Sequence, residues 1–306
     1  MAPALVGQLT LSGRKTKIPA LVYGTAWKKE RTKELVVQAL RSGFLGVDTA
    51  AQPKHYREDL VGDALRQAII EGTVRRRDVY LQTKFTSVGG QNKNDMPYDP
   101  SLPIPEQVRA SVASSLRNFQ PGTTTDEEET YIDCLVLHSP LPTLAQTLQA
   151  WKVLEEYVPH KIRNLGISNV GLATLQHLYA TTKIKPAVVQ NRFYPQTKFD
   201  VAVRRFCREN NIVYQSFWTL TANPKLLASE PVGSLVTEAA VSNEVALYCL
   251  VLGLGNTVVL DGTTNEGRMK GDLQGLSNVR RWIDADANRQ TWDSILLRFK
   301  TLIREQ

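Results

Sequence analysis

Asp48, Lys84 and His138 each stand at the end of a short apolar run in this sequence. Such a run is typical of a buried strand in a parallel sheet. In a parallel barrel the carboxyl ends of the strands meet on one face, and the chemistry of such proteins takes place there. We therefore expect these three side chains to form one site that handles protons.

The rest of the chain alternates short apolar runs with longer amphipathic runs. An opening β-hairpin is expected from two short runs on either side of Ser12-Gly13-Arg14. Strands are predicted at residues 20–23, 44–49, 79–84, 132–138, 162–169, 187–191, 212–217 and 257–260. Helices are predicted at 30–42, 58–71, 105–119, after Thr143, at 172–180, 200–210, in the region up to 252, from 266 onward and at 289–303.

Eight strand–helix units predict an α/β fold, a (β/α)8 barrel with an N-terminal β-hairpin and a C-terminal helix. We expect residues 1–306 to form this barrel as a single domain. The alternative is a doubly wound sheet, which requires a GxGxxG turn after the first strand. Residues 252–255 offer the nearest match, but they lack the third glycine and are typical of a turn between a helix and a strand.

Composition narrows the possible partners. The net charge of +7 and the isoelectric point of about 9.3 suit an anionic ligand such as a phosphorylated cofactor. Lysine and arginine are scattered, without the basic stripe and interleaved aromatic residues of a nucleic-acid-binding surface. The four histidines fall on separate elements, so we expect no zinc site.

The cysteines and apolar runs indicate the compartment. The three cysteines form no CxxC pair, and their odd number argues against a disulfide framework. There is no signal-peptide pattern and no run near the roughly 18 apolar residues of a membrane span. We expect a cytoplasmic protein that does not engage a membrane.

The motifs at the predicted strand ends together resemble the aldo-keto reductase superfamily over nearly the whole chain. They are Gly24-Thr25-Ala26-Trp27-Lys28, Val47-Asp48-Thr49-Ala50, Gln82-Thr83-Lys84, Leu137-His138-Ser139-Pro140, Gly166-Ile167-Ser168-Asn169, Val189-Gln190-Asn191 and Arg268. The resemblance implies an NADP-dependent oxidoreductase that reduces a small aldehyde or ketone to an alcohol by hydride transfer. It also implies a nicotinamide cofactor at the barrel mouth, in a monomer or small homo-oligomer.

By the same resemblance, Asp48, Lys84 and His138 fill three of the four catalytic places. The fourth belongs to a tyrosine five residues after the aspartate, where this chain has Pro53. An insertion of two or three residues leaves Tyr56 as the expected general acid and His55 as its competitor. A tyrosine has an ordinary pKa of about 10, and a nearby ammonium group favours its phenolate form.

The cofactor residues also come from the resemblance. The expected set is Gly24, Thr25, Ser168, Asn169, Gln190, Ser216, Phe217, Thr263 and Arg268. The stacking tyrosine of the family is replaced by Gln215, so Phe217 or Trp218 is expected to take its place. Gly262 replaces the usual lysine of the phosphate site, and Asp272 replaces an asparagine near the adenine. NADPH is therefore the expected cofactor, with NADH as the alternative.

The substrate pocket is expected to include Trp27, His55 and Trp218, together with Phe193 and the loop at residues 86–103. The chain ends on a helix, without a long tail to cover the mouth, which favours an open site for a bulky or varied carbonyl compound. A second hypothesis is a cofactor-binding barrel that acts as a redox-sensing or regulatory subunit without significant turnover. The displaced tyrosine motivates it.

Overall fold

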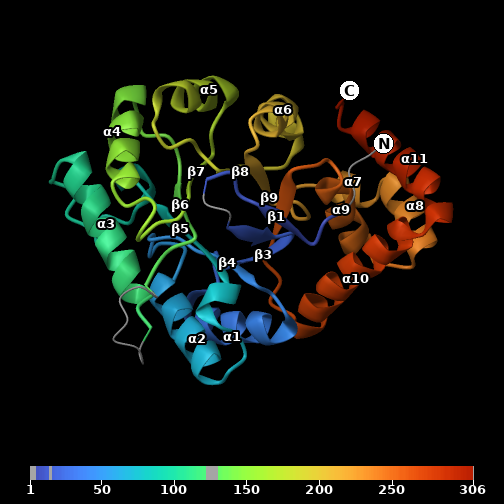
Figure 1. Ribbon diagram of the computed structural model, residues 1–306, viewed down its shortest axis with the longest axis horizontal. Helices are drawn as coiled ribbons and strands as arrows, with labels where there is room; N and C mark the ends of the chain where they lie inside the picture. Colours follow the sequence, from blue (N-terminus) through green and yellow to red (C-terminus); the bar gives the residue numbers. More distant parts are fainter. Residues whose placement is uncertain (1–4, 14–15, 122–129, 306) are drawn as a thin grey trace.

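Eight parallel strands close into a barrel in the computed structural model, which describes residues 5–13, 16–121 and 130–305. Figure 1 shows the barrel surrounded by helices, which confirms the predicted (β/α)8 fold and excludes the doubly wound sheet. In barrel order the strands are β10 (Thr257–Asp261), β3 (Leu21–Gly24), β4 (Gly46–Asp48), β5 (Tyr80–Phe85), β6 (Cys134–Leu137), β7 (Leu165–Ser168), β8 (Val188–Arg192) and β9 (Val213–Phe217).

The predicted hairpin, β1 (Gln8–Thr10) and β2 (Lys17–Pro19), closes the amino-terminal end of the barrel. Leu11 and Ile18 are buried there in one cluster with inward-facing barrel residues such as Val22 and Val188. Burying this apolar plug stabilises the fold and leaves the opposite end, where the strands finish, open to ligands.

The helices follow the predicted order with small shifts at their ends. They are α1 (Thr32–Ser42), α2 (Glu58–Ile70), α3 (Ile104–Asn118), α4 (Leu144–Glu155), α5 (Leu172–Thr181), α6 (Val201–Glu209), α7 (Pro224–Leu227), α8 (Glu230–Ala239), α9 (Asn243–Leu252), α10 (Glu266–Asp284) and α11 (Asp286–Leu302). Thr143 caps α4 as expected, because its hydroxyl accepts from Gln146 N at 3.2 Å. The turn expected at residues 252–255 lies at 253–256, because α9 extends to Leu252 and β10 begins at Thr257.

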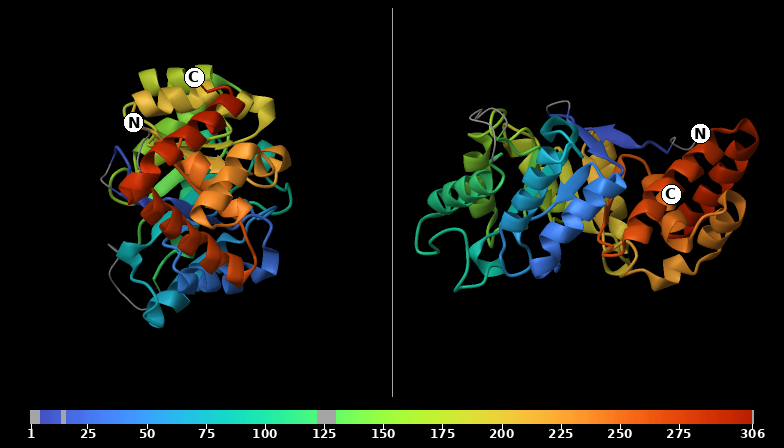
Figure 2. Two further views of the ribbon diagram at one scale, coloured as in Figure 1. Left: turned by 90° about the vertical axis from the view of Figure 1, so that its right-hand side faces the viewer. Right: turned by 90° about the horizontal axis from the view of Figure 1, so that it is seen from below.

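The helices α8 to α11 pack together at one end of the molecule (Figure 2), away from α3. The helix α9 is buried almost throughout, and α10 packs against both α9 and α11. Among the described helices, none is by itself long and apolar enough to cross a membrane; α8 and α9 together reach that length and hydropathy but are bent by 105°.

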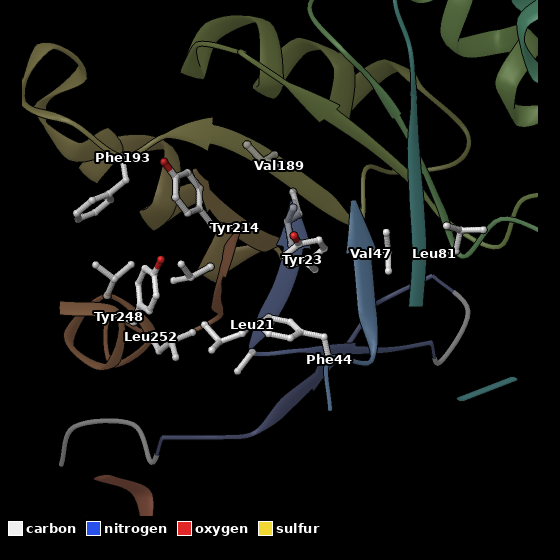
Figure 3. Packing of buried hydrophobic residues seen from close by; sticks show 14 of the residues in the cluster. Leu21, Tyr23, Phe44, Val47, Leu81, Val189, Phe193, Tyr214, Tyr248 and Leu252 are labelled. Carbon is white, nitrogen blue, oxygen red and sulfur yellow. The ribbon is translucent and has the colours of Figure 1, made fainter. Parts of the chain in front are cut away.

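Apolar side chains fill the space between the barrel and the helices. Figure 3 shows part of this layer, in which Leu21, Tyr23 and Phe44 lie together near the first strands. The rings of Tyr23 and Phe44 meet edge to face, with centroids 5.5 Å apart. Cys134, Cys207 and Cys249 are buried and free.

The helices α2 and α3 approach each other at Gly62. A Cβ atom at this position would collide with the carbonyl oxygen of Asn118, which also accepts from Arg66 Nη1 at 2.8 Å. Because the backbone of Asn118 can shift only at a cost in free energy, glycine is the residue that fits at position 62. This contact fixes α2, and with it the loop that precedes α2 and carries Tyr56.

We predict that Gly62→Ala lowers the free energy of unfolding by about 2 kcal/mol or more, because the overpacked backbone must shift. Gly233→Ala is the matched control, since Gly233 lies in α8 with open space around its Cβ position. There, alanine is expected to stabilise the helix by roughly 0.5–1 kcal/mol. Urea denaturation of both variants measures the difference, and equal stabilities would contradict the assigned contact.

Candidate active site

A buried ion pair joins β4 to β5 at the open end of the barrel. Lys84 Nζ donates to the two carboxylate oxygens of Asp48 at 2.7 and 2.6 Å, and to Thr49 O at 2.7 Å. The side chains are 1% and 2% exposed, so each charge relies on the other for compensation. Burial is the largest cause of a lowered Lys84 pKa, and the Asp48 charge opposes it.

Three glutamine side chains lie beside this ion pair. Gln82 and Gln190 both donate through Nε2 to Asp48 Oδ1, at 2.6 and 3.0 Å, and both also donate to Gln215 Oε1 at 2.8 Å. Gln215 Nε2 donates back to Gln82 Oε1 at 2.9 Å. This network connects β4, β5, β8 and β9 and holds the Asp48 carboxylate in one orientation.

Tyr56 lies next to the ion pair despite its altered spacing from Asp48. Its backbone N–H donates to Gln52 O at 3.0 Å in a tight turn of the loop before α2. Lys84 Nζ lies 5.1 Å from the centroid of the Tyr56 ring, and the ring of His138 lies 6.0 Å from it at an angle of 71°. The structure thus brings all four expected catalytic residues together.

The electrostatic effect on Tyr56 differs from the effect expected of a nearby ammonium group. Burial, the larger cause, and the charge of Asp48 raise the Tyr56 pKa well above its usual value. Because Asp48 compensates Lys84, the phenol keeps its proton in the resting site. A protonated phenol is the form that donates a hydrogen bond to a ligand.

His138 is neutral at physiological pH. Its pKa falls to about 3, first because the ring is buried and then because of the charges of Lys84, His55 and Arg192. Its Nδ1 is 2.6 Å from Thr86 Oγ1, a contact that fixes the plane of the ring. A neutral imidazole retains one N–H donor, which suits orienting a carbonyl better than supplying a charged proton donor.

His55 lies at the rim, against Trp27. The two rings stack with centroids 3.8 Å apart, and Trp27 N donates to His55 O at 2.8 Å. Trp27 has a φ of +64° and is 64% exposed, an unusual conformation that holds its indole over the cleft mouth. This arrangement places Tyr56, rather than His55, in contact with His138 and Lys84.

One cleft of about 1530 Å³ runs from these residues to the start of α10. It is lined by the expected residues Gly24, Ser168, Asn169, Gln190, Phe217, Thr263 and Arg268, and by Trp27, His55 and Trp218. Asn169 Nδ2 donates to His138 O at 2.9 Å, which ties the amide to the catalytic end.

Three of the positions expected to bind the cofactor or the substrate do not line the cleft. Thr25 is fully buried, and its hydroxyl donates to Asp48 O at 2.9 Å. Ser216 is fully buried and shares a hydrogen bond with Thr219 Oγ1 at 2.6 Å. Phe193 is also buried and packs on Phe199, with centroids 5.2 Å apart. These buried side chains pack against the strand ends outside the cleft lining.

The far end of the cleft contains a carboxyl pair. Asp261 and Asp272 are close enough to affect each other's ionisation, and burial is the largest cause of a raised pKa at both carboxyl groups. Burial, followed by the negative charge of Asp261, raises the Asp272 pKa to about 7. Lys28 lies nearby, with Nζ donating to Gly262 O at 2.8 Å, and burial lowers its pKa to about 8.

The sequence interpretation placed Thr86 in the pocket loop without its contact with His138, and it did not single out Lys28 or Arg192 as parts of the site. Lys28 is in the quoted motif, but its contact with Gly262 is too distant in sequence to predict. Arg192 had a readable signal, because side chains two residues apart point to the same face of a strand. Its position after Gln190 on β8 therefore places it toward the barrel mouth, where it lines the cleft.

These features define a (β/α)8-barrel protein with a buried lysine–aspartate pair, a tyrosine and a histidine at the carboxyl ends of its strands. A family model described as the aldo/keto reductase family matches residues 16–230. The chain belongs to this family. Among the described residues, no cluster of three histidine, cysteine, aspartate or glutamate side chains is arranged to hold a metal ion.

Individual relatives share no more than about a third of their aligned residues with this chain. An uncharacterized oxidoreductase of Schizosaccharomyces pombe is 30% identical over 212 residues, which cover 68% of this chain and 66% of that protein. An NAD/NADP-dependent indole-3-acetaldehyde reductase of the same organism is 28% identical over 221 residues, with coverages of 68% and 67%. The chain thus spans about two thirds of the length of these two relatives.

Solved structures share the fold at low identity. A silkworm (Bombyx mori) aldo-keto reductase complexed with NADPH superimposes with a TM-score of 0.68 at 18% identity, covering 92% of this chain and 88% of that chain. A Brucella melitensis aldo/keto reductase gives a TM-score of 0.67 at 21% identity and covers 92% of this chain and 100% of that chain.

We predict that Lys84→Met lowers the free energy of unfolding by about 3 kcal/mol, because it leaves the Asp48 carboxylate buried without a countercharge. The double variant Asp48→Asn, Lys84→Met removes both charges and is expected to recover part of this loss. Guanidinium denaturation of the two variants provides the measurement. A double variant that is no more stable than the single variant would contradict the dependence of the two charges on each other.

Proposed function

We propose that this protein reduces an aldehyde or ketone to an alcohol, with Tyr56 as the general acid. The observation that carries the proposal is the position of Tyr56 close to both Lys84 and His138, in spite of the inserted residues. Family membership supports the reaction class, and the protonated state of the phenol supports its role as donor.

Each neighbour of Tyr56 has a part in this proposal. His138 donates a hydrogen bond that orients the substrate carbonyl, since the neutral ring has an N–H to offer. As negative charge develops on the carbonyl oxygen, the proton of Tyr56 passes to it. Lys84 stabilises the phenolate that remains, and Asp48 holds Lys84 in place.

The cleft fits an extended dinucleotide by the chemistry of its lining. Ser168, Asn169 and Gln190 present hydroxyl and amide groups near Tyr56, where a carboxamide needs both donors and acceptors. Thr263 and Arg268 lie at the start of α10, where backbone N–H groups and a guanidinium favour a phosphate. When bound, the nicotinamide cofactor supplies the hydride.

We propose NADPH as the cofactor, with NADH as the second candidate. Arg268 favours a 2′-phosphate, whereas the carboxyl pair of Asp261 and Asp272 opposes one when both groups are ionised. Relatives are named for both cofactors, as in the NAD/NADP-dependent reductase of Schizosaccharomyces pombe. The balance between these groups sets the preference in this chain.

The alternative of a regulatory subunit without significant turnover rested on the displaced tyrosine. The location of Tyr56 next to Lys84 and His138 supports the reductase instead. We propose that the whole chain works as one barrel domain on a small carbonyl compound, as a monomer or small homo-oligomer.

We predict that Tyr56→Phe lowers the rate of NADPH oxidation with an aromatic aldehyde by roughly 100-fold or more, the size expected for a positioned general acid. His55→Phe is the matched control and is expected to have a much smaller effect, because His55 stacks on Trp27 at the rim. NADPH binding, followed by quenching of tryptophan fluorescence, should survive in both variants. If His55→Phe alone abolishes turnover, the acid is His55.

We also predict that NADPH binds more weakly as the pH rises through about 7. Asp272 has a raised pKa of about 7, so it is neutral below this pH and negatively charged above it. The dissociation constant should rise by about fivefold more in the wild type than in Asp272→Asn between pH 6.5 and 8.5, equivalent to about 1 kcal/mol of repulsion. Comparing the two proteins cancels the titration of the cofactor phosphate itself. Identical profiles would contradict a role for Asp272.

A further inference from the structure

Arg192 stands at the carboxyl end of β8, on the cleft wall close to the proposed reacting groups. Its Nη1 donates to Asn169 Oδ1 at 2.7 Å, and Asn169 in turn donates to the backbone of His138. Its charge contributes to the lowered pKa of His138. The guanidinium group is therefore part of the catalytic end of the cleft, not of the distant end at α10.

Two aromatic rings of the neighbouring strand end hold this guanidinium group. Its carbon Cζ lies 5.2 Å from the ring centroid of Phe217 and 4.7 Å from that of Trp218, and Arg192 pairs with Phe217 in the register of β8 and β9, which lie side by side in Figure 1. Trp218 is 51% exposed and has a φ of +59°, a conformation that persists only where its surroundings impose it.

The charge of Arg192 lacks a carboxylate partner among residues 5–13, 16–121 and 130–305. The other charged groups at this end compensate each other, since Asp48 pairs with Lys84. His138 is neutral, and Tyr56 keeps its proton. Among the described residues at this end of the cleft, the positive charge of Arg192 is left without an internal counter-ion, and such a charge attracts an anionic ligand.

The geometry of the group suits recognition of a planar anion. A guanidinium carries five N–H donors in a fixed fork, and the hydrogen bond to Asn169 uses one of them. The contacts with Phe217 and Trp218 restrict the Arg192 side chain, so less side-chain entropy is lost when a carboxylate binds. Lysine at this position would lack the fork.

We propose that the substrate carries a carboxylate in addition to its carbonyl group, and that Arg192 binds this carboxylate. The inference rests on the proposed reductase function and narrows its substrate class to oxo acids. The cofactor also carries anionic groups, but its phosphate-binding candidates Thr263 and Arg268 lie near the start of α10, whereas Arg192 contacts the residues around His138.

The test compares 4-formylbenzoate with its methyl ester, two aldehydes that differ in the charge at the far end of the ring. The wild type is expected to favour the carboxylate in kcat/KM. In Arg192→Met, the ratio of the two kcat/KM values should fall by roughly 10- to 100-fold, the usual size for a charge-assisted bidentate contact. Arg192→Lys should recover only part of the ratio. Arg205→Met, which removes an exposed arginine of α6 outside the cleft, should leave the ratio unchanged.

The ratio of the two kcat/KM values separates recognition of the carboxylate from a general loss of activity. A disturbance of Asn169 would lower kcat/KM for both aldehydes alike. An equal fall for both aldehydes in Arg192→Met, with an unchanged ratio, overturns the proposal. If that fall comes with weaker NADPH binding by fluorescence, Arg192 serves the cofactor phosphates. Failure of the proposed reductase function gives a different result from failure of the Arg192 proposal. In that case the wild type either binds NADPH without reducing either aldehyde or does not bind NADPH.

Discussion

The ion pair between Lys84 and Asp48 is the interaction on which the rest of the site depends. Each charge is costly to bury alone, so the pair requires close contact and further hydrogen bonds. Gln82 and Gln190 supply two of these bonds from β5 and β8. The strands that carry these residues can meet around one carboxylate only in a closed parallel barrel, and the site therefore depends directly on the topology of the fold.

The pair also determines the protonation of its neighbours. Because Asp48 compensates Lys84 so closely, the lysine does not lower the pKa of Tyr56 in the resting site, and burial keeps the phenol protonated. Burial and surrounding positive charge keep His138 neutral. The resting site thus contains two neutral hydrogen-bond donors over a compensated ion pair. Such donors strengthen their interaction when a ligand oxygen becomes negative, as required for transition-state stabilisation.

Sequence periodicity predicted the barrel and the positions of Asp48, Lys84 and His138, because a strand end is readable from a short apolar run. Periodicity did not decide whether Tyr56 or His55 is the general acid. The two residues are adjacent, and their positions depend on the loop turn at Gln52. Thr25 and Ser216 were assigned to the cofactor although their side chains are buried. Contacts across the barrel, such as Thr86 with His138, join residues far apart in sequence, and no local pattern specifies them.

The two ends of the cleft differ in how their charge responds to pH. At the catalytic end, the compensated ion pair and the neutral imidazole leave Arg192 as a positive charge that persists across the physiological range. At the α10 end, burial and the charge of Asp261 raise the Asp272 pKa to about 7, so the charge there changes within that range. A ligand anion bound by Arg192 would therefore meet nearly the same field at pH 6.5 and 8.5. A phosphate near α10 would meet a more negative field at the higher pH, and pH thus acts on cofactor recognition more than on substrate recognition.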